Sequence, residues 1–183
     1  YRVWSNISGT WGSQVEIGAT TGSDIREARI YFSPVNQKRI VVTENSVGEL
    51  DLYVSWNGIE WNQTRNITDL WTSAPAVHYR GYDVAFESAT GDALLIFAVN
   101  TTVTSCDLAY FDIPAGGLAN NSSYVCIDDS GVGTDVKYTW VNADSDPITS
   151  SSEIIAVGFD NTGNDNEAWV WDGSAWANQQ SIS

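Results

Sequence analysis

The sequence predicts an all-β protein built from repeated four-stranded antiparallel units, arranged as a propeller-like or β-sandwich array, with about three and a half units in 183 residues. Residues 52–61 and 168–176 share one pattern of alternating aromatic and apolar residues, then Asn-Gly or Asp-Gly, then Trp. Alternation with period two is typical of a half-buried strand, and Asn-Gly and Asp-Gly favour a tight hairpin turn. Looser copies of the pattern lie at residues 1–12 and 107–126.

The spacing of these hairpins indicates a true repeat. Trp4 and Trp56 are 52 residues apart, and Trp56 and Trp171 are 115 residues apart, about twice as far. Two further apolar segments recur in phase with the hairpins. They lie at residues 28–34, 82–88 and 137–141, and at residues 39–43, 93–97 and 153–157. Four short strands within a period of about 55 residues favour propeller blades or a related β-array.

The units follow one another along the chain without a linker, so we expect a single domain over residues 1–183. Residues 1–17 supply only two strands, which is half a unit. Full units are predicted over residues 24–68, 79–127 and 136–183.

Aromatic residues at alternate strand positions are typical of a core. We therefore expect Trp4, Trp56, Trp140 and Trp171 to be buried. Trp71 lies instead in a connection after a full unit. It is the best candidate for an exposed side chain that stacks on a sugar or contacts another subunit.

The net charge of −15, from 23 acidic and 8 basic residues, argues against nucleic-acid binding because no basic stripe is present to neutralise phosphates. The acidic surface is expected to be solvated and self-repelling, which favours solubility. No apolar run reaches 18 residues, so no membrane span is predicted.

Residues for catalysis are scarce, and we predict that the protein is not an enzyme. His78 is the only histidine, and no Ser or Cys near it stands in a nucleophile motif. No pair of carboxylates has a spacing that identifies a glycosidase, and the six arginines show no pattern. No cofactor is expected.

The only two cysteines, Cys106 and Cys126, bracket the hairpin that lacks the Trp-Asn-Gly pattern. A disulfide there would close a loop of about 20 residues and stabilise the fold by roughly 3 kcal/mol. The alternative is a pair of buried free thiols.

Six asparagines stand in Asn-X-Ser/Thr motifs, most of them in predicted turns or at strand edges. We predict glycosylation at one or more of Asn6, Asn62, Asn66, Asn100, Asn120 and Asn121. Glycans and a disulfide both indicate an extracellular or cell-surface protein.

Residues 160–167 form an acidic loop between two predicted strands, with oxygen ligands on alternate residues. Asp160, Asn164 and Asp165 are therefore candidate ligands for Ca²⁺. The loop lacks the glycine and closing glutamate of an EF-hand, and a polar turn is expected at this place in any case.

The turns at Trp56-Asn57-Gly58 and Trp171-Asp172-Gly173, with the Gly91-Asp92-Ala93-Leu94 segment ahead of a strand, resemble repeats in secreted and cell-surface β-propeller-like proteins of archaea and bacteria. They also resemble, more distantly, the Asp-box of sialidase-type propellers, although residues 55–61 are one residue short and have Asn in place of Asp. The resemblance implies a fold and an extracellular setting. It assigns no catalytic residue to this chain.

Two functions from different classes remain. The first is a glycosylated structural protein, a surface or filament subunit whose partner is a further copy of itself. The alternative is a carbohydrate-binding, lectin-like propeller module that uses exposed aromatic residues.

The half unit at residues 1–17 bears on this choice, because a bare strand edge is rarely left exposed. It could pair with the third unit of its own chain, or complete the sheet of the next subunit in a head-to-tail polymer. It could also mark a piece cut from a larger propeller. We expect exchange between subunits.

Overall fold

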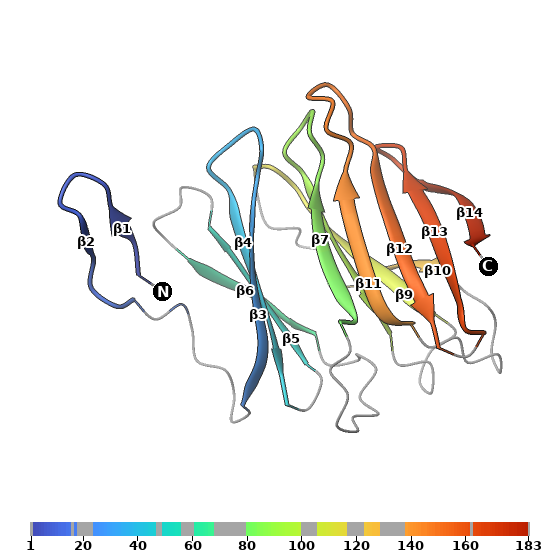
Figure 1. The fold of residues 1–183 in the computed structure, drawn as a ribbon. Coiled ribbons are helices and arrows are strands. Elements are labelled where there is room, and N and C mark those ends of the chain that lie inside the picture. Colours follow the sequence, from blue (N-terminus) through green and yellow to red (C-terminus); the bar gives the residue numbers. More distant parts are fainter. Residues whose placement is uncertain are drawn as a thin grey trace.

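The computed structural model describes residues 2–15, 17, 24–46, 49–55, 61–67, 80–99, 106–116, 123–128, 138–161 and 163–182. These residues form strands and turns with no helix, so none of the described segments is a helix that crosses a membrane. Figure 1 shows three sheets side by side in chain order, with a small hairpin apart at the N-terminal end.

Each of the three sheets has four antiparallel strands in sequence order. The first sheet contains β3 (Ile25–Phe32), β4 (Arg39–Asn45), β5 (Leu50–Ser55) and β6 (Asn62–Ile67). The second contains β7 (Tyr82–Phe86), β8 (Ala93–Ala98), β9 (Leu108–Ile113) and β10 (Val125–Asp128). The third contains β11 (Tyr138–Ser145), β12 (Ile154–Asp160), β13 (Asp165–Trp171) and β14 (Trp176–Ile182). The N-terminal hairpin pairs β1 (Trp4–Ser5) with β2 (Thr10–Trp11).

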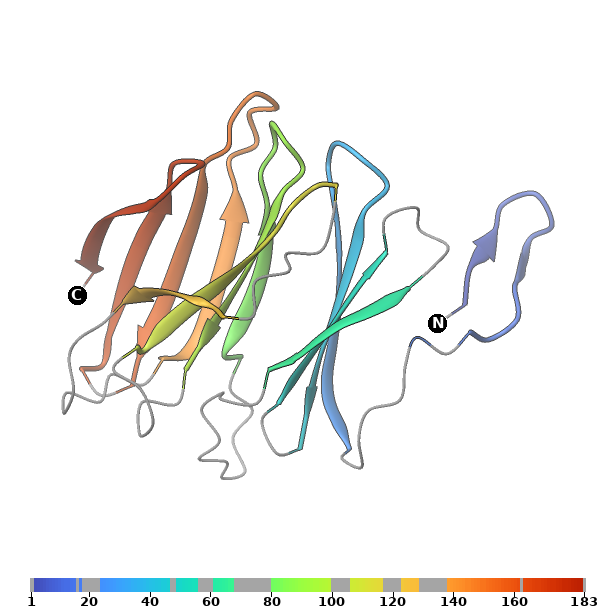
Figure 2. The same cartoon turned by 180° about the vertical axis from the view of Figure 1, so that it is seen from behind.

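The first strands of the three sheets, β3, β7 and β11, form the inner side of the array. The backbone N–H of Val141 donates to the carbonyl of Arg80 at 2.7 Å, which joins β11 to the start of β7 in a parallel bridge. The hydroxyl of Tyr31 on β3 donates to Asp83 on β7 at 2.8 Å. The last strands, β6, β10 and β14, lie at the opposite edge of each sheet (Figure 2).

Two hydrophobic cores fill the spaces between the sheets, and β8 shows how one strand serves both. Leu95 and Phe97 point into the core shared with the first sheet, whereas Leu94 and Ile96 point into the core shared with the third. Successive side chains of a strand point to opposite faces, so a continuous apolar run is expected where both faces are covered. The second sheet is therefore the buried middle layer of the array.

The predicted all-β fold with repeated four-stranded units is confirmed, but two of the predicted core tryptophans are not buried. Trp171 is 6% exposed, whereas Trp4 is 46% and Trp140 is 49% exposed. Trp140 follows a β-bulge after Tyr138, and its register partner Phe159 lies on the sheet face that points away from the second sheet. Trp4 belongs to the isolated hairpin, where it packs edge-on against Trp11. Trp56 lies outside the described residues.

The predicted disulfide between Cys106 and Cys126 is present, with a Cα–Cα distance of 5.7 Å. Cys106 precedes β9, and Cys126 lies in β10 opposite Ala109. The bond therefore ties the short outer strand β10 to the buried strand beside it.

Candidate ligand-binding cleft

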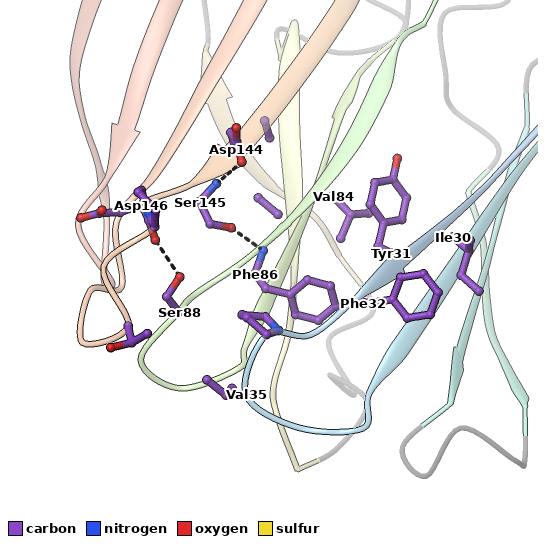
Figure 3. A pocket seen from close by; sticks show the side chains of 15 residues that line it. Ile30, Tyr31, Phe32, Val35, Val84, Phe86, Ser88, Asp144, Ser145 and Asp146 are labelled. Carbon is purple, nitrogen blue, oxygen red and sulfur yellow. Dashed lines mark hydrogen bonds between the residues drawn. The ribbon is translucent and has the colours of Figure 1, made fainter. Parts of the chain in front are cut away.

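A cleft of about 570 Å³ opens along the inner strands, at the end where β3, β7 and β11 turn into the strands that follow them. The first sheet contributes Phe32 and Val35, the second contributes Phe86 and Ser88, and the third contributes Asp144, Ser145 and Asp146. Figure 3 shows these side chains around one space, with aromatic residues on the side of β3 and acidic residues on the side of β11. Clefts of this size with a few polar groups on an apolar wall are the usual form of a small-molecule site.

The aromatic wall is the side of the cleft formed by Phe32 at the end of β3, and the alternation of side chains along β3 explains its exposure. Tyr31 points toward the second sheet and packs against its core, so its neighbour Phe32 points to the other face and is 59% exposed. Phe86 on β7 is buried behind the cleft. The aromatic wall therefore presents one solvent-accessible ring, that of Phe32, beside the buried ring of Phe86.

Asp83, buried behind the cleft, fixes the three inner strands relative to one another. Its carboxylate accepts hydrogen bonds from the Tyr31 hydroxyl at 2.8 Å, from Arg80 at 2.6 Å and from the backbone N–H of Ala143 at 2.9 Å. These donors come from β3, from the start of β7 and from β11. Burial and the Asp83 carboxylate both raise the pKa of Tyr31, so its hydroxyl keeps the proton that it donates.

Lys38, which ends the turn after β3, fixes that turn to the second sheet. Its side chain is 1% exposed, and its ammonium group donates to the carbonyls of Ile113 and Pro114, the latter at 2.9 Å. Burial lowers the pKa of Lys38 to about 8, against the opposing effect of Asp92 and Asp112. The position of the aromatic wall is thus set by a buried cation that binds backbone carbonyls.

The acidic wall is held by hydrogen bonds between the turn after β7 and the strand β11. The Ser145 hydroxyl accepts from the backbone N–H of Phe86 at 3.2 Å, and the Ser88 hydroxyl donates to the carbonyl of Asp146 at 2.7 Å. One Asp144 oxygen accepts from the backbone N–H of Ser145 at 2.9 Å. Asp144 is exposed, so its carboxylate can also accept hydrogen bonds from a ligand.

The predicted site residues fall in different parts of the chain. Asn6 is exposed in the β1–β2 turn, and Asn62 and Asn66 belong to β6. Trp71, Asn100, Asn120 and Asn121 lie outside the described residues, as does His78. Glycosylation and the role of Trp71 stay predictions.

The predicted calcium loop joins β12 to β13, and Asp160 and Asp165 are direct register partners. One Asp160 oxygen accepts from the backbone N–H of Gly163 at 2.8 Å, and Asn164 adopts a positive φ of 58° in the turn. Within the described ranges, no group of three or more His, Cys, Asp or Glu side chains has a geometry that could hold a metal ion. The calcium site stays a prediction.

The cleft was not identified from the sequence, although a usable pattern was present. The turns that begin near residues 33, 88 and 145 occur at the same phase of the repeat. Equivalent turns of adjacent units lie at the same end of adjacent sheets, so their side chains gather in space. Asp83 was also a clue, because an acid inside the apolar strand Tyr82–Phe86 requires a buried partner.

No protein-family model and no curated protein matches the sequence. Solved structures with a similar fold include the following two. AofleA from Arthrobotrys oligospora has a TM-score of 0.57 at 14% identity, over 100% of this chain and 49% of that chain. The BP39L lectin from Burkholderia pseudomallei has a TM-score of 0.58 at 12% identity, over 96% of this chain and 46% of that chain. This chain therefore spans about half the length of each, and identities this low show the fold alone.

Proposed function

We propose that this protein is a carbohydrate-binding, lectin-like module and that the cleft along β3, β7 and β11 is its binding site. The observation that carries the proposal is the pairing of an exposed aromatic ring, Phe32, with the carboxylates of Asp144 and Asp146 across one cleft. The fold adds support, since one of the solved structures similar to this chain is a lectin.

The two walls suit the two kinds of surface that a sugar presents. The C–H groups on one face of a pyranose ring pack on an aromatic ring, as Phe32 would allow. The hydroxyl groups at the edge of the sugar are hydrogen-bond donors, and carboxylate oxygens such as those of Asp144 accept from them. The acidic wall also disfavours anionic ligands, so the expected ligand is a neutral sugar rather than a sialic acid or a sulfated glycan.

The module acts by binding alone, without catalysis, in an extracellular setting. The disulfide between Cys106 and Cys126 fits an oxidising compartment. The exposed Asn6 leaves room for a glycan on the β1–β2 turn. The fold likeness to a lectin favours this function over that of a surface or filament subunit.

The proposal is tested by a screen of neutral mono- and oligosaccharides, followed by calorimetric titration of the best ligand. Phe32→Ala removes the exposed ring and is expected to weaken binding at least tenfold, and Asp144→Asn is expected to weaken it several-fold. Trp11→Ala is the matched control, because Trp11 is an exposed aromatic residue that does not line the cleft and belongs to β2, in the hairpin that lies apart from the three sheets in Figure 1.

Equal losses in Phe32→Ala and Trp11→Ala would contradict the assignment of the cleft. Failure of every neutral sugar to bind would contradict the function itself. Recovery of the ligand unchanged after long incubation is expected for a binding module, and its cleavage would show an enzyme instead.

A further inference from the structure

The turn that joins β3 to β4 forms one side of the cleft. Val35 in this turn lines the cleft together with Phe32, the last residue of β3 (Figure 3). Two hydrogen bonds close the turn. The backbone N–H of Ser33 donates to the carbonyl of Lys38 at 3.0 Å, and the backbone N–H of Lys38 donates to the side-chain oxygen of Asn36 at 2.8 Å. The position of Lys38 therefore determines the position of the cleft residues before it.

The ammonium group of Lys38 holds this turn against the second sheet. Lys38 is 1% exposed, and its nitrogen donates to the carbonyls of Ile113 and Pro114 and, at 3.4 Å, to that of Gly91. The same nitrogen lies 5.8 Å from the centroid of the Phe86 ring, which lines the cleft. Three carbonyl oxygens thus surround an amine that carries three N–H donors only when it is protonated.

Gly91, in the turn that joins β7 to β8, allows a close approach at this place. Its φ is 77°, and a Cβ there would lie 2.6 Å from side-chain atoms of both Val35 and Asn36. The two turns are therefore in direct contact beside the cleft. The hydrogen bond from Lys38 to the Gly91 carbonyl crosses this contact, so it acts directly on the turn that carries Val35.

We propose that Lys38 is a positioning residue of the cleft, whose ammonium group keeps the β3–β4 turn in the position that binds the sugar, so that loss of its proton weakens binding. The inference rests on the proposed function and extends it, because Lys38 does not itself line the cleft. A neutral amine has two N–H donors for the three carbonyls, and its hydrogen bonds are about half as strong as those of an ammonium group. Deprotonated Lys38 therefore holds the turn less firmly.

The proton is lost at moderately alkaline pH. Burial lowers the pKa of Lys38 to about 8, and two carboxylates of the second sheet, Asp92 just before β8 and Asp112 on β9, act in the opposite direction. The ordinary lysine value of 10.5 applies to the unfolded chain. The folded state thus releases this proton first, and the group adds folding stability as the pH rises from 8 to 10.5. Unfolding driven by Lys38 therefore cannot explain a loss of affinity in this range.

Calorimetric titration of the tightest neutral sugar between pH 7 and pH 9.5 tests the inference. The affinity of the wild type is expected to fall about fivefold, with a midpoint near pH 8. Because coupling between a ligand and a proton is reciprocal, saturating sugar should also move the titration of the Lys38 side chain to higher pH, as followed by NMR. A lysine that only stabilises the fold would show no such shift.

Variants separate the charge of Lys38 from other effects of pH. Lys38→Arg stays charged throughout this range, so its affinity should not depend on pH. Lys38→Met has neither charge nor donors, so it should bind weakly at every pH. Arg26→Met is the control, because it removes an exposed positive charge on β3 that does not line the cleft, and it should keep the wild-type profile. If a Lys38 variant does not fold, the wild-type profile and the NMR titration still decide.

The two possible failures are distinguishable. If no neutral sugar binds at pH 7, the proposed function is contradicted, and the role of Lys38 with it. If a sugar binds with the same affinity at pH 7 and pH 9.5, or leaves the titration of Lys38 unchanged, the role of Lys38 is overturned and the proposed function stands.

Discussion

At the scale of single residues, buried charges organise the molecule. The Asp83 carboxylate accepts hydrogen bonds from residues of β3 and β11 and from Arg80 at the start of β7. Glu87, which follows β7, accepts a hydrogen bond from the indole N–H of Trp171 at 2.7 Å. Both carboxylates are nearly inaccessible to water. A buried carboxylate is tolerated when its oxygens are hydrogen-bonded, and its donors are then held in fixed positions.

Asp83→Asn tests this role. The amide has the size of the carboxylate but carries no charge for Arg80, and one of its two polar atoms cannot accept a hydrogen bond. We expect the free energy of unfolding to fall by about 3 kcal/mol. Denaturant unfolding measures the change, with Asp24→Asn at an exposed carboxylate just before β3 as control. A change below about 1 kcal/mol in Asp83→Asn would contradict the proposed role.

Glu44 gives a prediction about pH. It lies opposite Glu27 in the β3–β4 register, and burial together with Glu27 raises the pKa of Glu44 to about 7, with Arg26 acting in the other direction. The folded state thus holds a proton that the unfolded state loses near pH 4.5. Stability from this group is complete below about pH 4.5 and is lost as the pH rises through 7.

Glu44→Gln mimics the protonated form at every pH. We therefore expect the variant to melt at a higher temperature than the wild type at pH 8, and at the same temperature at pH 4.5. Melting curves at the two pH values decide the matter, and an equal difference at both would show an effect other than titration.

At the scale of elements, most strands were predictable because their patterns are local. Period two and the Asn-Gly and Asp-Gly turns are properties of a few neighbouring residues, so β4 and β12 lie close to the apolar segments predicted at residues 39–43 and 153–157. The burial of Trp140 was mispredicted because the β-bulge at the start of β11 changes which face the following residues occupy. Such a bulge depends on the neighbouring sheet.

The disulfide gives a prediction for one element. In the described part of the chain β10 pairs only with β9. The Cys106–Cys126 disulfide is therefore an important covalent link between β10 and the rest of its sheet. The double variant Cys106→Ala/Cys126→Ala is expected to lose about 3 kcal/mol of unfolding free energy, mainly through the larger entropy of the unfolded chain. Reduction of the wild type should give a similar loss, and hydrogen exchange should increase first in β10. An unchanged denaturation midpoint would contradict this account.

At the scale of the whole molecule, the repeat predicted the sheets, but it did not predict what lies between them. Phe32 and Asp144 are more than a hundred residues apart in the sequence, and the cleft that they line exists only because β3, β7 and β11 lie side by side.

A crystal structure of the protein with the tightest neutral sugar from the screen tests the central claim most directly. The account predicts the sugar in the cleft, with one ring face packed on Phe32 and a hydroxyl group within hydrogen-bond distance of Asp144. A sugar bound on the N-terminal hairpin or between the outer strands, with the cleft empty, would contradict it.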